Sequence, residues 1–496
     1  MLTLSILIPI AGALVLAISP KLAEAQARFA AIIVSAVPLL LLVIVWIGFD
    51  TSPSAPAFQS VAEAPWIPTL GVAWRVGVDG IALALSLMTA LLFIAAVTWP
   101  ADTMGRTRQY YAWFLFLEGV SLGLFLTLDL LIFYVFFDLS LVGMYFLIGR
   151  WGHGDAKAAA LKFFVYTLAG SLAILLAIIA LALSHDPLTF DMRTLIADQP
   201  LSAGAGASLV LLGFLLGFAI KTPLVPFHTW LPPAHVDAPG PASAILAGVL
   251  LKMGTYGIVR IPMSMMSETF ARWALPIGIL ALVSILWGAL VAFAQKNLKR
   301  RIAYTSVNHM GYTVLGIAAA GAFTAKGSTA ARDLALTGAV TEMVAHGLIT
   351  GSLFLIAGAF WQRAQSYDLD NYGGLARIAP KLTAATVLAT FASFGLPALA
   401  GFVAEFQIFT GTFAVYPWLA ALGLLGILIT AALFLVMVQS LFFGDLPPQR
   451  AHFPDLRGPE IWVVSVLLFL VVLIGIWPAW LLDLIGAGTR ALIEGG

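Results

Sequence analysis

Long apolar runs, separated by short polar connections, repeat along the whole chain. A helix needs about 20 apolar residues to cross a bilayer. Runs of about that length occupy residues 2–18, 29–49, 80–99, 110–128, 130–149, 160–183, 207–227, 241–262, 273–294, 303–322, 334–361, 382–413, 417–443 and 460–486. The pattern predicts an all-α polytopic membrane protein with about 14 transmembrane helices. The run 382–413 exceeds one span and contains Gly395 and Pro397, so we expect a broken helix there.

A second interruption of the apolar pattern combines prolines with charged residues inside predicted membrane-spanning segments. Lys221 is followed by Pro223 and Pro226, and Lys252 lies well inside the next apolar run. A charged side chain near the bilayer centre is costly and usually faces a protein interior or a water-filled path. A broken helix at that depth is tolerated only in similar surroundings. We therefore expect both lysines to belong to an ion path; the alternative is a kinked structural helix whose lysines extend to the interface.

The two breaks also indicate an internal repeat. Asp138 precedes His309 by almost the same distance as the break after Lys221 precedes the break at Gly395. Paired interrupted helices at corresponding positions are typical of transporters built from inverted repeats. Because a five-helix unit is odd-numbered, its second copy would cross the membrane in the opposite sense. We expect N-terminal helices 1–3 at 1–109, a first five-helix repeat at 110–262, a second, inverted repeat at 263–443, and a last helix at 444–496, with helices 7 and 12 broken.

Ionisable side chains within the apolar runs suggest a proton path. Acids, lysines and histidines alternate among them, which suits a relay whose proton affinities must cross during a cycle. The residues that we expect to carry proton translocation are Asp138, Lys221, Lys252, His309, His346 and Glu405, with Glu342 and Glu118 as further candidates.

Structural roles stay open for several of these residues. A buried histidine is often only a hydrogen-bonding group between helices, which applies to His309 and His346. Glu405 follows the second break and is also placed to cap the helix that restarts there. Glu342 lies four residues before His346, which also fits a local pair on one helix face. Beyond the first break, histidines 228 and 235 are expected near the inner surface, in contact with water.

Composition limits the chemistry. The chain is 61% hydrophobic and 10% charged, and its polar interruptions are too short for a soluble domain. It contains no cysteine, which excludes disulfides, thiolate iron–sulfur clusters and thiolate zinc sites. Seven histidines leave haem possible but unsupported. We expect no cofactor and no metal in this chain, and the net charge of +1 gives no indication of nucleic-acid binding.

The distribution of Lys and Arg predicts orientation. One set of alternate connections, which includes the cluster Lys296, Lys299, Arg300 and Arg301, holds more than twice as many basic residues as the other. The poorer side has only Arg75, Arg193, Arg260, Arg272, Lys326, Arg332 and Arg490. The positive-inside rule puts the richer side in the cytoplasm, so both termini are expected outside.

Several motifs resemble one known family. They are FYVFFDLSLVGMYFLIGRWG, IKTPLVPFHTWLPPAHVDAPGPASAILAGVLLKMGTYGIVR, QKNLKRRIAYTSVNHMGY, MVAHGL and LPALAGFVAEF. Together they look like the antiporter-like membrane subunits of respiratory complex I, the proton-pumping NADH-quinone oxidoreductase. The resemblance covers nearly the whole chain, and the second motif is highly specific.

The resemblance implies roles for individual residues. Lys221 would be the pumping lysine of the first half-channel, with Asp138 as its acidic partner, and Lys252 the central lysine. Glu405 would be the terminal acid, where L- and N-type relatives carry lysine; this and the short segment after the last span favour the M type. Two departures from the family are Asp138, usually Glu, and Glu342, commonly an uncharged residue.

The resemblance also implies partners and a location. The other membrane subunits, especially the L-type and N-type chains, would be neighbours, and NADH, flavin, iron–sulfur clusters and quinone would be handled by other subunits. The expected location is an energy-transducing membrane, the bacterial inner membrane, with both termini on the periplasmic side. Two alternatives remain: the D-type subunit of a multisubunit sodium/proton antiporter, which shares the lysine axis, and an inert membrane scaffold.

Overall fold

The computed structural model describes residues 1–19, 22–322 and 328–494. Lys326, one of the basic residues used for orientation, lies outside these ranges. The helices of the N-terminal half are α1 (Leu2–Ile18), α2 (Glu24–Ile47), α3 (Gly80–Thr98), α4 (Thr107–Leu126), α5 (Leu130–Trp151), α6 (Ala156–Leu183), α7 (Met192–Asp198), α8 (Ala205–Lys221), α9 (Leu231–Asp237), α10 (Gly240–Ile245) and α11 (Leu251–Ile258). Two π-helical segments, Leu246–Leu250 and Val259–Met263, continue α10 and α11.

The C-terminal half is also helical. Its helices are α12 (Ser267–Ala294), α13 (Leu298–Ala320), α14 (Thr329–Ala364), α15 (Pro380–Ser393), α16 (Ala400–Val415), α17 (Pro417–Phe442), α18 (Pro459–Ile476) and α19 (Ala479–Glu494). In the described ranges, nine helices are long and apolar enough to cross a membrane, and α1, α8 and α16 are shorter apolar helices. The predicted helical membrane fold is thereby confirmed, although the last predicted run, 460–486, divides into α18 and the start of α19.

Both predicted breaks are present. α8 ends at Lys221 and α9 begins only at Leu231, because Pro223 and Pro226 lack the N–H groups that would continue the helix. In the second half α15 ends at Ser393 and α16 begins at Ala400. Gly395 between them has φ +73°, a left-handed conformation that glycine adopts without a Cβ penalty.

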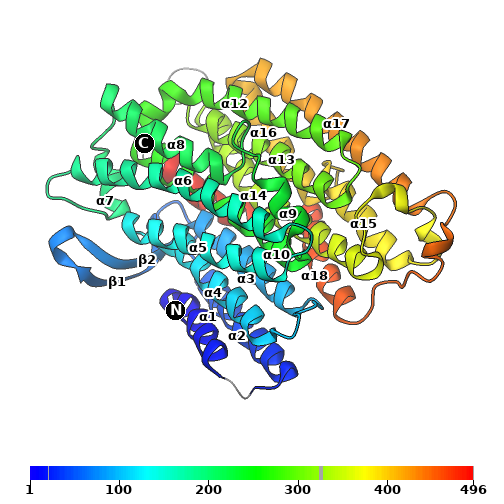
Figure 1. Cartoon of the computed structure of the whole chain (residues 1–496). Helices are drawn as coiled ribbons and strands as arrows, with labels where there is room; N and C mark the ends of the chain where they lie inside the picture. The colour runs from blue at the N-terminus through cyan, green and yellow to red at the C-terminus, as the bar shows by residue number, and fades with distance from the viewer. Residues whose placement is uncertain (20–21, 323–327, 495–496) are drawn as a thin grey trace.

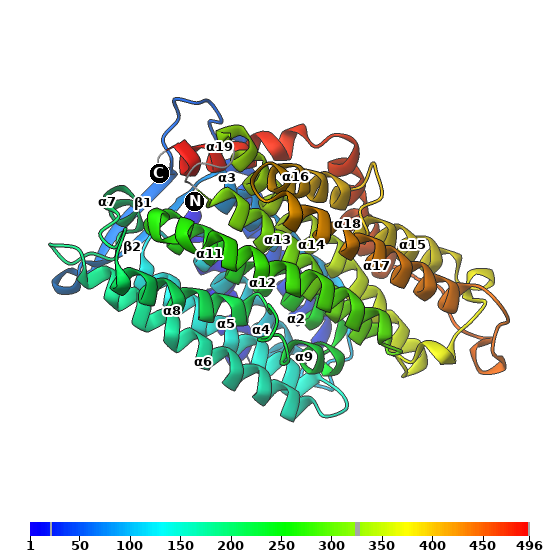
Figure 2. The ribbon, with the colours of Figure 1, turned by 90° about the horizontal axis from the view of Figure 1, so that it is seen from above.

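Two helical segments form the centre of the bundle. The apolar windows of Gly240–Met263 and of α14 are completely buried inside the chain, whereas that of α2 is 28% buried. The axes of the long helices are roughly aligned, and α6, α12 and α17 lie on the outside of the bundle (Figures 1 and 2). The central segments carry Lys252 and His346, so these polar groups are shielded from lipid on every side.

A short β-hairpin, which hydropathy did not predict, projects from one end of the bundle. Strands β1 (Gln59–Ile67) and β2 (Val72–Val78) pair antiparallel. The start of α1, helix α7 and the end of α19 lie at the same end in both views (Figures 1 and 2). Helix α12 begins beside α7, where Ser267 Oγ donates a hydrogen bond to Gln199 Oε1. Because α12 extends from there along the bundle to Ala294, the basic connection between α12 and α13 lies at the opposite end.

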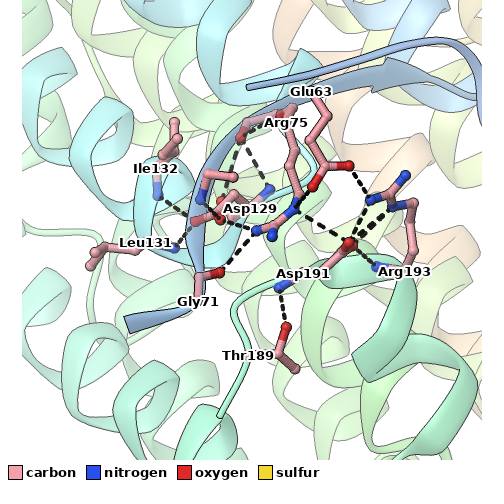
Figure 3. A network of polar contacts seen from close by, with 11 residues as sticks. Glu63, Gly71, Arg75, Asp129, Leu131, Ile132, Thr189, Asp191 and Arg193 are labelled. Carbon is pink, nitrogen blue, oxygen red and sulfur yellow. Dashed lines mark hydrogen bonds and ion pairs between the residues drawn. The ribbon is translucent and has the colours of Figure 1, made fainter. Parts of the chain in front are cut away.

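A charged network fixes this hairpin to the bundle (Figure 3). Arg75 on β2 donates to Glu63 Oε1 at 2.8 Å and to Asp129 Oδ2 at 2.7 Å. Asp129 also caps α5. Arg193 on α7 donates to Asp191, and its Nη2 lies 3.0 Å from Glu63 Oε2. The network thus joins the hairpin, the α4–α5 connection and α7.

Candidate functional site

Lys221 is the last residue of α8, directly before the first break, and its side chain is 1% exposed. Its Nζ donates to Ser140 Oγ of α5 at 3.0 Å and lies 4.8 Å from the centre of the Phe137 ring. Among the described residues, Asp138 makes no hydrogen bond or ion pair with Lys221. Within the described chain, Asp138 Oδ1 is buried without a hydrogen-bond partner. The direct hydrogen-bond partner of Lys221 is therefore the Ser140 hydroxyl, and not the predicted Asp138.

Lys252 lies at the bundle centre, completely buried, and contacts two acceptors. Its Nζ is 2.6 Å from His346 Nδ1 and 2.6 Å from the carbonyl oxygen of Ala247. Ala247 belongs to the first π-helical segment, and such segments often mark functional sites. Because each of the two nitrogen atoms either holds or accepts a proton, the Lys252–His346 contact is suited to passing one proton between them.

His309 continues the line from His346. The two imidazole rings have centroids 5.4 Å apart. Nε2 of His309 is 3.1 Å from Ser393 Oγ, at the end of α15. Nδ1 is 3.2 Å from Glu342 Oε1 and 4.0 Å from Glu405 Oε1; the first is an ion-pair distance without hydrogen-bond alignment. One nitrogen of this imidazole therefore faces two buried carboxyl groups.

Glu405 ends this line at the second break. A Cβ on Gly395 would lie 2.1 Å from Glu405 Oε2, so only glycine leaves room for the carboxylate in its present position. Glu405 also lines a cavity of about 490 Å³, together with Gly395, Thr410 and phenylalanines of α16. The break thus places an acid between the buried line and a cavity.

Thr222 lies between the two lysines. It follows Lys221, and its Oγ1 would be 2.3 Å from a Cβ on Gly254, two residues after Lys252. This hydroxyl is buried and has no hydrogen-bond partner among the residues that the structure describes. Buried polar groups of this kind are usually satisfied by ordered water. The Thr222 hydroxyl packs closely against the backbone of α11 at Gly254.

Glu118 lies apart from the line. It is completely buried on α4 beside Ser35 of α2, and in the described residues neither carboxylate oxygen has hydrogen-bond geometry with a partner. His228 and His235 follow the first break, but both are buried, at 7% and 0% exposure, instead of lying at the surface. His235 stacks on Phe354 with centroids 4.3 Å apart. The sequence predicted no role for His235, although a histidine that follows a helix break next to a buried lysine could have indicated a functional residue.

The geometry thus gives two groups. Lys252, His346, His309, Glu342 and Glu405 form a continuous line of neighbours across α11, α13, α14 and α16. Lys221, Ser140 and Asp138 form a second group at the first break. Each member of the line can bind and release a proton.

The chain is similar to known proteins along most of its length. Residues 127–430 match the family described as NADH:quinone oxidoreductase/Mrp antiporter, TM. The chain is 35% identical over 512 residues to NADH-quinone oxidoreductase subunit M of Rhodobacter capsulatus, covering 100% of this chain and 96% of that one. It is 36% identical over 489 residues to NAD(P)H-quinone oxidoreductase chain 4 of a Nostoc species, covering 96% and 88%.

Solved structures show the same architecture. A chain of respiratory complex I from Thermus thermophilus with bound NADH superposes with a TM-score of 0.86 at 30% identity, covering 99% of this chain and 100% of that one. A chain of the Mrp complex from a Dietzia species also gives 0.86, at 21% identity and 99% and 97% coverage, which is a likeness of fold.

Proposed function

Since the chain belongs to the NADH:quinone oxidoreductase/Mrp antiporter family of membrane subunits, we propose that it is the M-type proton-translocating subunit of an NADH-quinone oxidoreductase. The family match confirms the resemblance predicted from the motifs. The relatives named above are subunits of quinone oxidoreductases, which makes the parent complex, and not this chain alone, the enzyme.

The observation that carries the proposal is the Lys252–His346 contact. Burying a lysine side chain at the centre of the bundle costs free energy, and such lysines in membrane proteins usually have a function in ion transport. Here the lysine nitrogen lies 2.6 Å from an imidazole nitrogen. From there the line continues to His309 and to the Glu342 and Glu405 carboxylates. Proton donors and acceptors thus extend from the centre of the bundle to the second break.

The proposed mechanism has two half-channels. The first repeat, 110–262, takes up protons near Lys221, where the Asp138 charge controls whether the lysine holds its proton. The proton then passes by the Thr222 hydroxyl, through water, to Lys252. The second repeat, 263–443, carries it by His346 and His309 to Glu405. Glu342 faces the same nitrogen of His309 as Glu405 does, so the imidazole has a second acid with which it can exchange a proton.

Electron transfer belongs to partners in this proposal. With no cysteine, the chain has no thiolate ligand for an iron–sulfur cluster, and flavin, clusters and quinone are assigned to other subunits. The neighbours in the membrane are L-type and N-type chains. The basic α12–α13 connection faces the cytoplasm, which places the hairpin and both termini on the periplasmic side of a bacterial inner membrane.

A second candidate follows from the family description, which also includes Mrp antiporters. The fold likeness to the Dietzia Mrp complex suits a D-type subunit of a multisubunit sodium/proton antiporter equally well. The relatives over 30% identical are quinone oxidoreductase chains, which favours the first candidate.

Affinity purification of the tagged chain from its own membranes distinguishes the candidates. We expect it to co-purify with flavin- and cluster-containing subunits and to show NADH:quinone activity coupled to proton uptake in vesicles. Co-purification with other antiporter chains alone, together with sodium-dependent proton exchange, would support the second candidate instead. Purification with neither activity would indicate a scaffold.

A further inference from the structure

An apolar cavity of about 490 Å³ lies between α2, α3, α14, α18 and α19. Its lining residues are all aliphatic, methionine or tryptophan, among them Leu87, Leu348 and Leu470. The volume is within the range of about 300–1,000 Å³ of ligand sites. Because α2, α3, α14 and α18 are long and apolar enough to cross a membrane, the occupant that suits this lining is a hydrocarbon chain.

One end of this cavity is marked by tryptophans at helix ends. Trp46 is next to the end of α2, and Trp477 follows the end of α18. Trp46 and Trp480 of α19 have ring centroids 5.6 Å apart. Trp480 Nε1 is buried and has no acceptor among the described residues, so this end of the cavity offers a free hydrogen-bond donor.

A smaller cavity of about 190 Å³, with polar as well as apolar lining residues, follows along the same seam. Phe49 and Ala487 line it, each three residues after a residue that lines the apolar cavity. Positions three apart lie on one helix face, so along α19 the two cavities follow each other. The polar side chains of its lining are Asp50, Ser52, Gln59 and Arg490.

Arg490 and Asp50 give this cavity one charge of each sign. Arg490 makes no hydrogen bond or ion pair with any residue that the structure describes, and its Nη1 lies 3.3 Å from where a Cβ on Gly486 would be, one turn back toward Trp480. The Ser52 backbone N–H, which donates to Asp50 Oδ1, holds the pKa of Asp50 below its ordinary value of 3.8, so Asp50 is anionic at neutral pH. A guanidinium suits phosphate and a carboxylate suits an ammonium group.

We propose that the α2–α19 seam binds a zwitterionic phospholipid of the phosphatidylethanolamine type. An acyl chain fills the apolar cavity, an ester carbonyl accepts from Trp480 Nε1, the phosphate contacts Arg490 and the ammonium group contacts Asp50. The site lies outside the proton path and does not depend on the proposed function. It would hold α19 against α2 and the start of α3.

Native mass spectrometry of the purified full chain tests the site, with phosphatidylethanolamine and phosphatidylglycerol of identical acyl chains added at graded concentrations. We expect at least tenfold tighter retention of phosphatidylethanolamine. Arg490→Gln should weaken its retention about tenfold, and Asp50→Asn should abolish the preference between the two lipids. Arg272→Gln, on an exposed arginine at the same end, is the matched control and should change neither value.

A variant that fills the apolar cavity distinguishes binding of the acyl chain from binding of the headgroup. Leu470→Trp should lower the retention of both lipids alike, and circular dichroism should show that each variant keeps its helix content. Equal binding of both lipids to the wild-type chain overturns the headgroup assignment. Unchanged retention in both Arg490→Gln and Leu470→Trp overturns the site as a whole.

Discussion

Gly395→Ala should disturb the terminal carboxylate of the proton line while leaving the bundle intact. The added Cβ would lie 2.1 Å from Glu405 Oε2, whereas ordinary contacts begin at 3.4 Å. The carboxylate must therefore move by about 1.3 Å, the difference between these two distances. Glu405 Oε1 is now 4.0 Å from His309 Nδ1, so a shift of this size changes the geometry of the last transfer substantially.

The backbone contributes separately. Alanine in the left-handed region costs about 1–2 kcal/mol. Gly444 supplies a matched control, because it has φ +86° and no atom within 4 Å of its potential Cβ. Gly444→Ala thus introduces the same backbone strain without the contact.

The assay is proton uptake by vesicles that contain the assembled complex, measured together with complex content. Gly395→Ala should lower proton uptake several-fold, whereas Gly444→Ala should affect stability alone. Glu405→Asp in the Gly395→Ala background shortens the acid and should restore part of the uptake. If both alanine variants pump equally well, the position of Glu405 over Gly395 has no role in transfer.

Three further predictions concern other parts of the molecule. Asp138→Asn should lower proton uptake sharply, and adding it to Lys221→Ala should cost little more, because residues that act as a unit are not additive; strictly additive losses would show a structural role for Asp138. At the hairpin, burial raises the pKa of Asp191, but hydrogen bonds and charge from Arg193 outweigh it and hold that pKa below the ordinary 3.8. The stabilisation by ionised Asp191 is fully present above pH 3.8 and is lost as the pH falls through the lowered pKa. The midpoint of thermal unfolding of Arg193→Gln should therefore depend less on pH below about pH 5 than that of the wild type. Parallel pH curves of the two midpoints would contradict this. Finally, the isolated chain should show no flavin, haem or cluster signal in optical and EPR spectra, and a stoichiometric signal would refute the assignment of electron transfer to partners.

Hydropathy and proline placement predicted the helices and both breaks, because each depends on local composition. Pro223 and Pro226 lack amide donors wherever they stand, and Gly395 with Pro397 ends a helix for equally local reasons. The motifs carried the family resemblance in the same way.

Side-chain partners were not predictable from the same signals. Asp138 was expected to be the acidic partner of Lys221, and the sequence did not indicate that Ser140, two residues later, makes the hydrogen bond. Which of the two reaches the lysine depends on how α5 is rotated against α8, and hydropathy does not determine that rotation. Glu118 shows the same effect, since its position within an apolar run did not reveal that it faces Ser35 of α2.

The hairpin was missed for a different reason. Its outer strand β1 is exposed along most of its length, so it has no hydrophobic alternation to detect. The strands are held by Arg75, whose partners Glu63 and Asp129 lie far apart in sequence. Long-range ion pairs of this kind leave no periodic pattern in the sequence.

The central claim is that protons pass through this chain by way of Lys252. Lys252→Met removes the proton carrier and nearly keeps its volume, but it leaves His346 Nδ1 and the Ala247 carbonyl oxygen without this partner, so assembly must be compared at the same time. Protons translocated per NADH oxidised should be measured in vesicles with equal complex content, with Lys296→Met, a change at an exposed lysine, as control. We predict that Lys252→Met lowers coupled proton uptake at least tenfold and that Lys296→Met leaves it unchanged; wild-type uptake in Lys252→Met would contradict the account.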